Sequence, residues 1–228
     1  MRQSALPSYT VMDRLILKAS LGLVVLATVM GALLLVSAGT IHYWQAWQFL
    51  GIYFAASILI SVYLIKKDLL KRRMAGGPTA EKAKPQKVIM VFASIGFIAL
   101  LVVPGLDRRN GWSQVSTIGV VLGDLLVAAG WLIIFMVFRE NSFASATIDI
   151  AADQKVISTG PYSIVRHPMY VGGLLLFLGM PLALASYWGL VAVAATVPFL
   201  VWRIFDEERF LRRNLAGYRE YCASSTGA

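Results

Sequence analysis

The chain has 228 residues, of which 58% are hydrophobic and 14% charged, and its mean hydropathy is +0.69. This composition is unlike that of a soluble globular domain and predicts an all-α integral membrane protein. The net charge of +9 would indicate nucleic-acid binding in a soluble protein, but here the basic residues gather in loops on one side of a membrane, so we expect no nucleic-acid partner. The single cysteine, Cys222, excludes an intrachain disulfide framework.

Apolar runs predict about six transmembrane helices in a single membrane domain. The first run is too long for the apolar core of a signal peptide, which is the competing interpretation. The third run ends at Pro104-Gly105, and residues 107–109 then form a small loop. From Phe205 onward the chain is amphipathic, which predicts an interfacial tail that lies on the membrane. The six runs cover residues 19–36, 49–65, 88–103, 116–138, 169–185 and 186–204.

Basic residues are distributed unevenly between the two ends of these spans. With six spans, the N-terminus, the loop 66–87, the connection 139–166 and the C-terminal stretch from Arg203 onward share one face and hold 19 of the 21 Lys and Arg residues. The positive-inside rule then places both termini in the cytoplasm. We expect a multi-pass protein of a bacterial cytoplasmic membrane, with the basic loop in contact with anionic membrane lipids.

Asp124 lies near the middle of the fourth predicted span. A carboxylate in lipid is costly, so this side chain should face the bundle interior or a cavity. It is either a structural group, hydrogen-bonded or protonated, or a substrate-binding residue. The polar cluster that begins at Arg139 contains Asn141, a second candidate for substrate binding at the membrane edge.

Two polar stretches flank the last hydrophobic hairpin. The first reads GPYSIVRHPMYVG over residues 160–172, and the second reads RIFDEE over residues 203–208. The first stretch enters a helix, where free backbone N–H groups can hold a carboxylate. Glu207 and Glu208 suit a cationic or hydroxyl-rich ligand, and Arg203 shares a helical face with Glu207. A ligand with carboxylate, ammonium, sulfonium and ribose groups fits this mixture, although ordinary ion pairing at a helix end is the simpler alternative.

Other chemistries find less support in the sequence. There is no phosphate-binding loop and no dinucleotide-binding glycine motif. Two histidines and one cysteine, far apart in the chain, make no convincing zinc site. We therefore expect no metal.

The two stretches resemble the isoprenylcysteine carboxyl methyltransferase and phospholipid methyltransferase superfamily. Members share a region close to G-x-Y-x-x-x-R-H-P-x-Y-x-G, then a hydrophobic hairpin, then R-x-x-x-E-E. The resemblance covers about residues 140–222, and the first three spans show no comparable signature. It divides the domain into a variable membrane body of three spans at 1–115 and a methyltransferase-like core with the cofactor site at 116–228. The matching positions are Gly160, Tyr162, Arg166, His167, Pro168, Tyr170, Gly172, Arg203, Glu207 and Glu208.

The resemblance implies transfer of a methyl group from S-adenosylmethionine, entering from the cytosol, to a lipophilic small molecule or membrane lipid. Arg203 would orient the acceptor and, with Glu207, is a catalytic candidate. The acceptor group can be a carboxylate, an amine or a thiol. An NADPH-dependent membrane reductase of the sterol-reductase type and a non-catalytic membrane protein are the alternatives. The implied cofactor-binding residues are Gln154, Lys155, Val156, Ile157, Gly160, Tyr162, His167, Pro168, Met169, Tyr170, Gly172, Glu207 and Glu208, and the substrate-binding residues are Arg203, Asn141 and Asp124.

Overall fold

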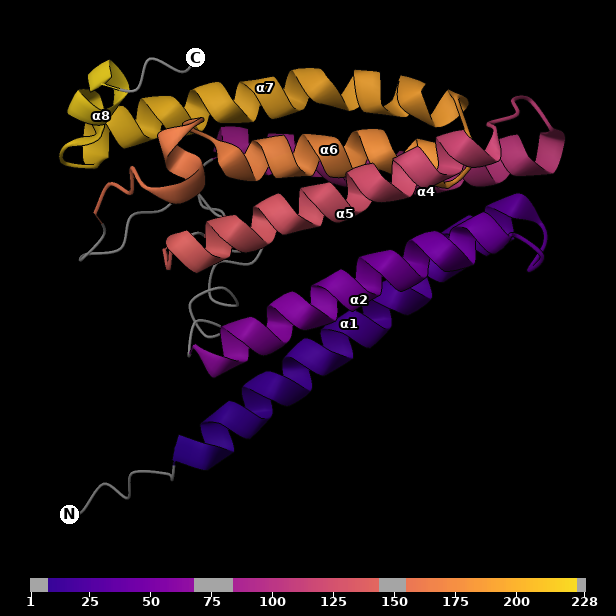
Figure 1. Ribbon diagram of the computed structural model, residues 1–228, viewed down its shortest axis with the longest axis horizontal. Coiled ribbons are helices and arrows are strands. Elements are labelled where there is room, and N and C mark those ends of the chain that lie inside the picture. The colour runs from indigo at the N-terminus through magenta and orange to yellow at the C-terminus, as the bar shows by residue number, and fades with distance from the viewer. Residues whose placement is uncertain (1–7, 68–83, 144–154, 225–228) are drawn as a thin grey trace.

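The protein is a bundle of helices that run back and forth along one direction (Figure 1). The computed structural model describes residues 8–67, 84–143 and 155–224, and this part of the chain contains seven α-helices, one short 3-10 helix and no strand. The all-α prediction is therefore confirmed. The elements are α1 (Ser8–Ala38), α2 (Trp44–Lys66), α4 (Lys84–Asn110), α5 (Thr117–Glu140), η2 (Gly160–Ser163), α6 (Pro168–Ala183), α7 (Trp188–Asn214) and α8 (Tyr218–Ser224).

Five of these helices, α1, α2, α4, α5 and α7, are long and apolar enough to cross a membrane. α6 is apolar but has only 16 residues, or about 24 Å at the α-helical rise, somewhat less than a bilayer core of about 30 Å. Its sides are covered by α5 and α7, so it completes the bundle as a shorter sixth helix. Large apolar side chains such as Leu59 and Ile118 point outward, 71% and 73% exposed, as expected of a lipid-facing surface.

Helix α4 does not end at the proline that was expected to terminate it. It continues through Pro104, so Asp107 lies in the last turns of the helix and not in a loop. An added Cβ on Gly105 would collide with Ser37 of α1, so the two helices are in close contact just beyond the proline. The Asp107 side chain is 1% exposed and accepts a hydrogen bond from Ser186. These tertiary contacts keep the helix going where the local pattern predicts a break.

Helix α7 also passes the boundary expected at residue 204. It runs without interruption from the last predicted span into the charged stretch, so the amphipathic tail begins inside α7 and only the seven-residue α8 is a separate helix. The charged turns remain helical because they contact α6 and the loop before it. Tyr170 bonds to Glu207, and Arg166 pairs with Glu208.

Consecutive long helices alternate in direction. The last turns of α2, α5 and α7 and the first turns of α4 and α6 therefore lie at one end of the bundle, which α8 marks at the left of Figure 1. We call it the α8 end. α1 and α2 lie along one side of the bundle and α7 along the other (Figure 1).

Helices α5 and α6 are in backbone contact along a seam of four glycines, Gly123 and Gly130 of α5 and Gly172 and Gly179 of α6. A Cβ added to Gly130 would lie 2.6 Å from the carbonyl oxygen of Gly172, and one added to Gly179 would lie 2.7 Å from that of Gly123. Small residues permit such close approach of helices in a membrane. The seam fixes the first turns of α6 against α5 and thereby positions the stretch identified in the sequence.

Candidate functional site at the α8 end

The loop after η2 leads directly into α6. Pro168 is the first residue of α6, where its fixed φ and missing N–H are tolerated. His167 is the N-cap, but its side chain makes no capping hydrogen bond. Pro168 has no N–H, and the N–H groups of Tyr170 and Val171 donate to the His167 carbonyl oxygen, so the Met169 N–H is the group of this first turn that can donate to a bound anion.

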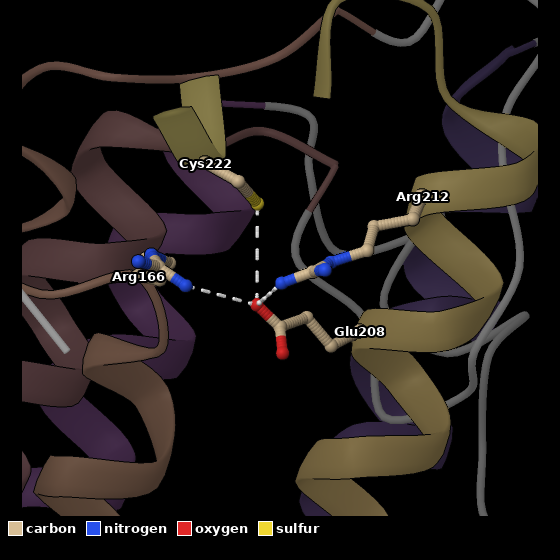
Figure 2. A network of polar contacts seen from close by, with 4 residues as sticks. All are labelled: Arg166, Glu208, Arg212 and Cys222. Atoms are coloured by element: carbon tan, nitrogen blue, oxygen red, sulfur yellow. Dashed lines mark hydrogen bonds and ion pairs between the residues drawn. The ribbon is translucent and has the colours of Figure 1, made fainter. Parts of the chain in front are cut away.

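The two predicted stretches meet between α6 and α7. The Tyr170 hydroxyl donates to Oε2 of Glu207 at 2.5 Å. The neighbouring Glu208 carboxylate accepts from Arg166 at 3.2 Å and from Arg212 at 3.1 Å. Figure 2 shows both guanidinium groups and the Cys222 thiol, whose Sγ is 3.9 Å away, converging on the same carboxylate oxygen. The charged end of α7 is thereby locked onto the loop that precedes α6.

A second set of contacts joins η2 to α5 and α8. The Asn141 amide donates to the Tyr162 hydroxyl at 2.9 Å, and the Tyr221 hydroxyl donates to the Tyr162 carbonyl oxygen at 2.7 Å. Burial raises the pKa of Tyr162, although the Asn141 hydrogen bond acts in the opposite direction. Tyr162 is therefore a neutral, fixed side chain that ties three elements together.

Two buried polar atoms at this end have no hydrogen-bond partner among the described residues, namely Nε2 of His167 and the hydroxyl of Tyr218. Burial lowers the pKa of His167, against the upward effect of the Glu207 and Glu208 charges, so its imidazole is neutral near pH 7. Burial raises the pKa of Tyr218, as do the charges of Glu208 and Glu207. A buried polar group without a partner costs free energy. These atoms are therefore ready to bind a polar ligand next to the two glutamates.

Arg203 lies on the side of α7 that faces α4. Its Nη1 donates to Oε1 of Gln86 at 2.7 Å and lies 3.5 Å from Sδ of Met90. The charges of Arg203 and Glu207 both act on the Tyr170 hydroxyl. Arg203 therefore connects the glutamate cluster with the α4 side of the bundle.

Several residues expected to bind the cofactor make packing contacts. Gly172 faces α5, where an added Cβ would lie 2.9 Å from the Gly130 carbonyl oxygen. Pro168 is buried, and Met169 packs against the apolar core. These contacts fix the start of α6 against α5 and the apolar core.

The segment before η2 lies against the turn between α7 and α8. An added Cβ on Gly217 would lie 3.8 Å from Cγ2 of Val156, which places Lys155, Val156 and Ile157 beside that turn. Gly160 has a φ of +58° and packs against Glu140, a backbone conformation that favours glycine. Gln154 is outside the described residues.

Asp124 is not brought to the α8 end. It precedes Glu140 by sixteen residues of α5, or about 24 Å along the helix. It is buried and accepts a hydrogen bond from Gln48 of α2. Its partner and its position favour the structural interpretation.

An apolar groove of about 520 Å³ lies between α2 and α5, and it too is separate from the glutamate cluster. Its α5 wall is made by Ala128, Trp131, Leu132 and Phe135, whereas Gly130 of the same helix faces α6. Helix α5 therefore stands between the groove and the site.

Three residues at this end were not anticipated from the sequence: Gln86, Tyr218 and Tyr221. The two tyrosines are three residues apart in an amphipathic tail, a spacing that places them on one helical face. Gln86 gives no comparable signal. In the part of the chain that the structure describes, no group of three or more His, Cys, Asp or Glu side chains is placed to hold a metal.

These features define a helical membrane protein with a polar site built where two helices meet at one end of the bundle. Residues 118–217 match the model of the phospholipid methyltransferase family, which is in the isoprenylcysteine carboxyl methyltransferase superfamily. The matched segment is similar to this family, and the resemblance carried by the two stretches is confirmed. It runs from the start of α5 to the turn before α8 and contains the whole of both stretches. No curated protein and no solved structure matches the chain.

Proposed function

We propose that the protein is an S-adenosylmethionine-dependent methyltransferase that methylates a lipophilic acceptor at the α8 end. The observation that carries the proposal is the contact between the two stretches, Tyr170 with Glu207 and Arg166 with Glu208, inside a segment that matches a family of membrane methyltransferases. No feature of comparable specificity supports an NADPH-dependent reductase or a non-catalytic protein.

The residues at this end fit the proposed cofactor. Its carboxylate suits the uncapped first turn of α6, and its ammonium or ribose hydroxyls suit the Glu207 carboxylate. The unpartnered His167 Nε2 and Tyr218 hydroxyl supply further hydrogen bonds for its polar groups. S-adenosylmethionine, when bound, supplies a methyl group on a positively charged sulfur. The role of Tyr170 is to hold the Glu207 carboxylate in one orientation.

Arg203 is proposed to bind the polar end of the acceptor. Met90 lies beside its guanidinium. One turn deeper, Phe199 of α7 stacks on Phe92 of α4, with the ring centroids 4.3 Å apart. Phe92 is 41% exposed on the membrane side, so a lipophilic molecule can reach Arg203 along an apolar surface. Catalysis then consists largely of holding the acceptor atom in line with the methyl carbon, with water excluded.

The distribution of basic residues supports a cytosolic position for the α8 end, where the proposed cofactor is available. The acceptor would enter from the lipid along α4 and α7. The two molecules would then approach the glutamate cluster from different sides. The methylated group can be a carboxylate, an amine or a thiol. The molecule that carries this group can be a membrane lipid or a small lipophilic compound.

Calorimetric titration of detergent-purified protein tests the cofactor. S-adenosylmethionine and S-adenosylhomocysteine should bind saturably, and binding should be lost in His167→Ala and Glu207→Ala. Matched controls are His42→Ala and Glu220→Ala, which remove the same groups at exposed positions. Binding of NADPH alone would indicate a reductase. If none of the three ligands binds to a folded sample, the proposal is overturned.

Transfer of a tritiated methyl group tests the acceptor class. The probes are phosphatidylethanolamine vesicles for an amine, N-acetyl-S-farnesylcysteine for a carboxylate and dodecanethiol for a thiol. Label should enter one class far faster than the others and should not do so in Glu207→Ala. Equal, Glu207-independent labelling of all three would contradict enzymatic transfer.

A further inference from the structure

A single buried amide joins α4 to the charged end of α7. Gln86 is 1% exposed, and both ends of its side-chain amide are used. Its Oε1 accepts from Nη1 of Arg203 at 2.7 Å, and its Nε2 donates to Oδ2 of Asp206. The glutamine therefore lies between a cation and an anion of the same helix.

Arg203 and Asp206 are three residues apart, and opposite charges at that spacing on a helix normally attract each other directly. The Gln86 amide lies between them and bonds to both. It satisfies the Asp206 carboxylate with an N–H donor and fixes the direction of the Arg203 guanidinium. A guanidinium has five N–H donors, so Arg203 can bond to Gln86 and to other groups at the same time.

We propose that Gln86 is a positioning residue that holds Arg203 in the orientation in which it binds the acceptor. The inference rests on the proposed function, because it takes Arg203 as the acceptor-binding cation. It adds a residue of α4 to a site whose other members lie in or beside the segment 118–217. Gln86 itself does not touch the cofactor or the acceptor and acts only through Arg203.

An amide at position 86 suits both partners, because it accepts from Arg203 and donates to Asp206. Leucine has a similar volume but neither bonds Arg203 nor satisfies Asp206, so the two charges would pair with each other. Glutamate keeps an acceptor for Arg203 but has no donor for Asp206 and adds a like charge beside it. Leucine therefore lets the Arg203 guanidinium turn toward Asp206, and glutamate repels the Asp206 carboxylate from its present place. A misplacement of about 1 Å at a reacting centre lowers a rate on the order of 100-fold.

The contact is tested first without any acceptor, by a double-mutant cycle on thermal unfolding. The variants are Gln86→Leu, Arg203→Met and the two together, in detergent-purified protein. Residues in direct contact give non-additive effects, so the double variant should lose less than the sum of the single losses. Strict additivity would overturn the proposal, because Gln86 would not hold Arg203 in solution.

The positioning role is tested by kinetics with whichever acceptor probe the wild-type protein methylates. Gln86→Leu should lower kcat/KM for that acceptor about 100-fold while the affinity for S-adenosylhomocysteine stays within twofold. The matched control is Gln48→Leu, which removes the same amide from a carboxylate partner, Asp124, far from Arg203. It should lower kcat/KM by no more than about twofold.

The outcomes separate the two proposals. Equal rates for Gln86→Leu and Gln48→Leu would overturn the role of Gln86 and leave the methyltransferase intact. A parallel loss of S-adenosylhomocysteine binding in Gln86→Leu would also overturn it, because that indicates general damage. A wild-type protein that binds neither adenosyl compound and labels no acceptor would overturn the proposed function, and the acceptor role of Gln86 with it.

Discussion

Replacing Gly172 by alanine distinguishes helix packing from cofactor contact at a position where the sequence predicts the latter. The added Cβ would lie 2.9 Å from the Gly130 carbonyl oxygen, whereas ordinary contact begins at 3.4 Å. The obstacle is backbone, so it cannot rotate away, and α5 and α6 must move apart by about half an ångström. Overpacking of this kind costs about 1–3 kcal/mol.

The next residue provides the control. Gly173 has no atom within 4 Å of an added Cβ, yet it lies in the same helix. Both alanines gain the same helix propensity, about 1 kcal/mol relative to glycine. That gain cancels in the comparison, so the difference between the variants is the packing cost alone. At about 2–4 °C per kcal/mol for a protein of this size, Gly172→Ala should unfold about 2–12 °C below Gly173→Ala.

The assay is thermal unfolding of both variants in detergent, with and without S-adenosylhomocysteine. Equal melting temperatures would refute the backbone contact between α5 and α6 at this position. A loss of S-adenosylhomocysteine binding in Gly172→Ala with no fall in melting temperature would return Gly172 to the cofactor site. Either result would require a different arrangement of the first turns of α6.

Three further predictions concern the charges at the α8 end. Arg166→Gln should lower the free energy of unfolding by about 1–3 kcal/mol, because Arg166 and Glu208 have side chains only 22% and 17% exposed. Arg212→Gln should lower it less, because the Arg212 side chain is 49% exposed, and the reverse order in a denaturant titration would contradict the geometry. Burial lowers the pKa of His167 in the folded protein. As the pH falls below about 6.5, the unfolded chain therefore binds a proton at His167 more readily than the folded chain does. The melting temperature should therefore decrease from pH 7 to pH 5, and it should decrease less in His167→Gln. Parallel pH curves for the wild-type protein and the variant would disprove this role of His167. A membrane-impermeant maleimide should label Cys222 in inside-out vesicles. It should label Asn110→Cys, made in a Cys222→Ser background, in right-side-out vesicles. The opposite pattern would reverse the expected orientation.

The helices themselves could be predicted because a chain in lipid must satisfy its backbone hydrogen bonds within each span, so that long apolar runs mean helices. Their ends could not. α4 passes Pro104 because Gly105 contacts α1 and Asp107 binds Ser186. Ser186 is 79 residues away from Asp107 in sequence, and no local pattern shows such a contact.

The contacts at the site also differ in whether the sequence could predict them. Tyr170 and Glu207 lie 37 residues apart on the two arms of one hairpin, so their proximity follows from the hairpin and could be anticipated. Arg203 and Gln86 lie 117 residues apart on helices that are not consecutive. The sequence marks Gln86 only as one polar residue within the basic loop 66–87, and which helix it faces is decided by how α4 packs on α7.

The two sides of the proposed site, for the methyl donor and for the methyl acceptor, come from different parts of the chain. The matched segment contains α5, η2, α6 and α7, and with them His167 and Glu207, the proposed cofactor side of the site. It does not contain α4, which packs against the other side of Arg203 through Gln86 and Met90. The first three spans therefore do more than anchor the domain: through α4 they form one wall around the proposed acceptor-binding arginine. A change of acceptor can then arise in α4 without disturbing the contacts of Glu207 and Tyr170, which is the physical basis for expecting residues 1–115 to vary with the substrate.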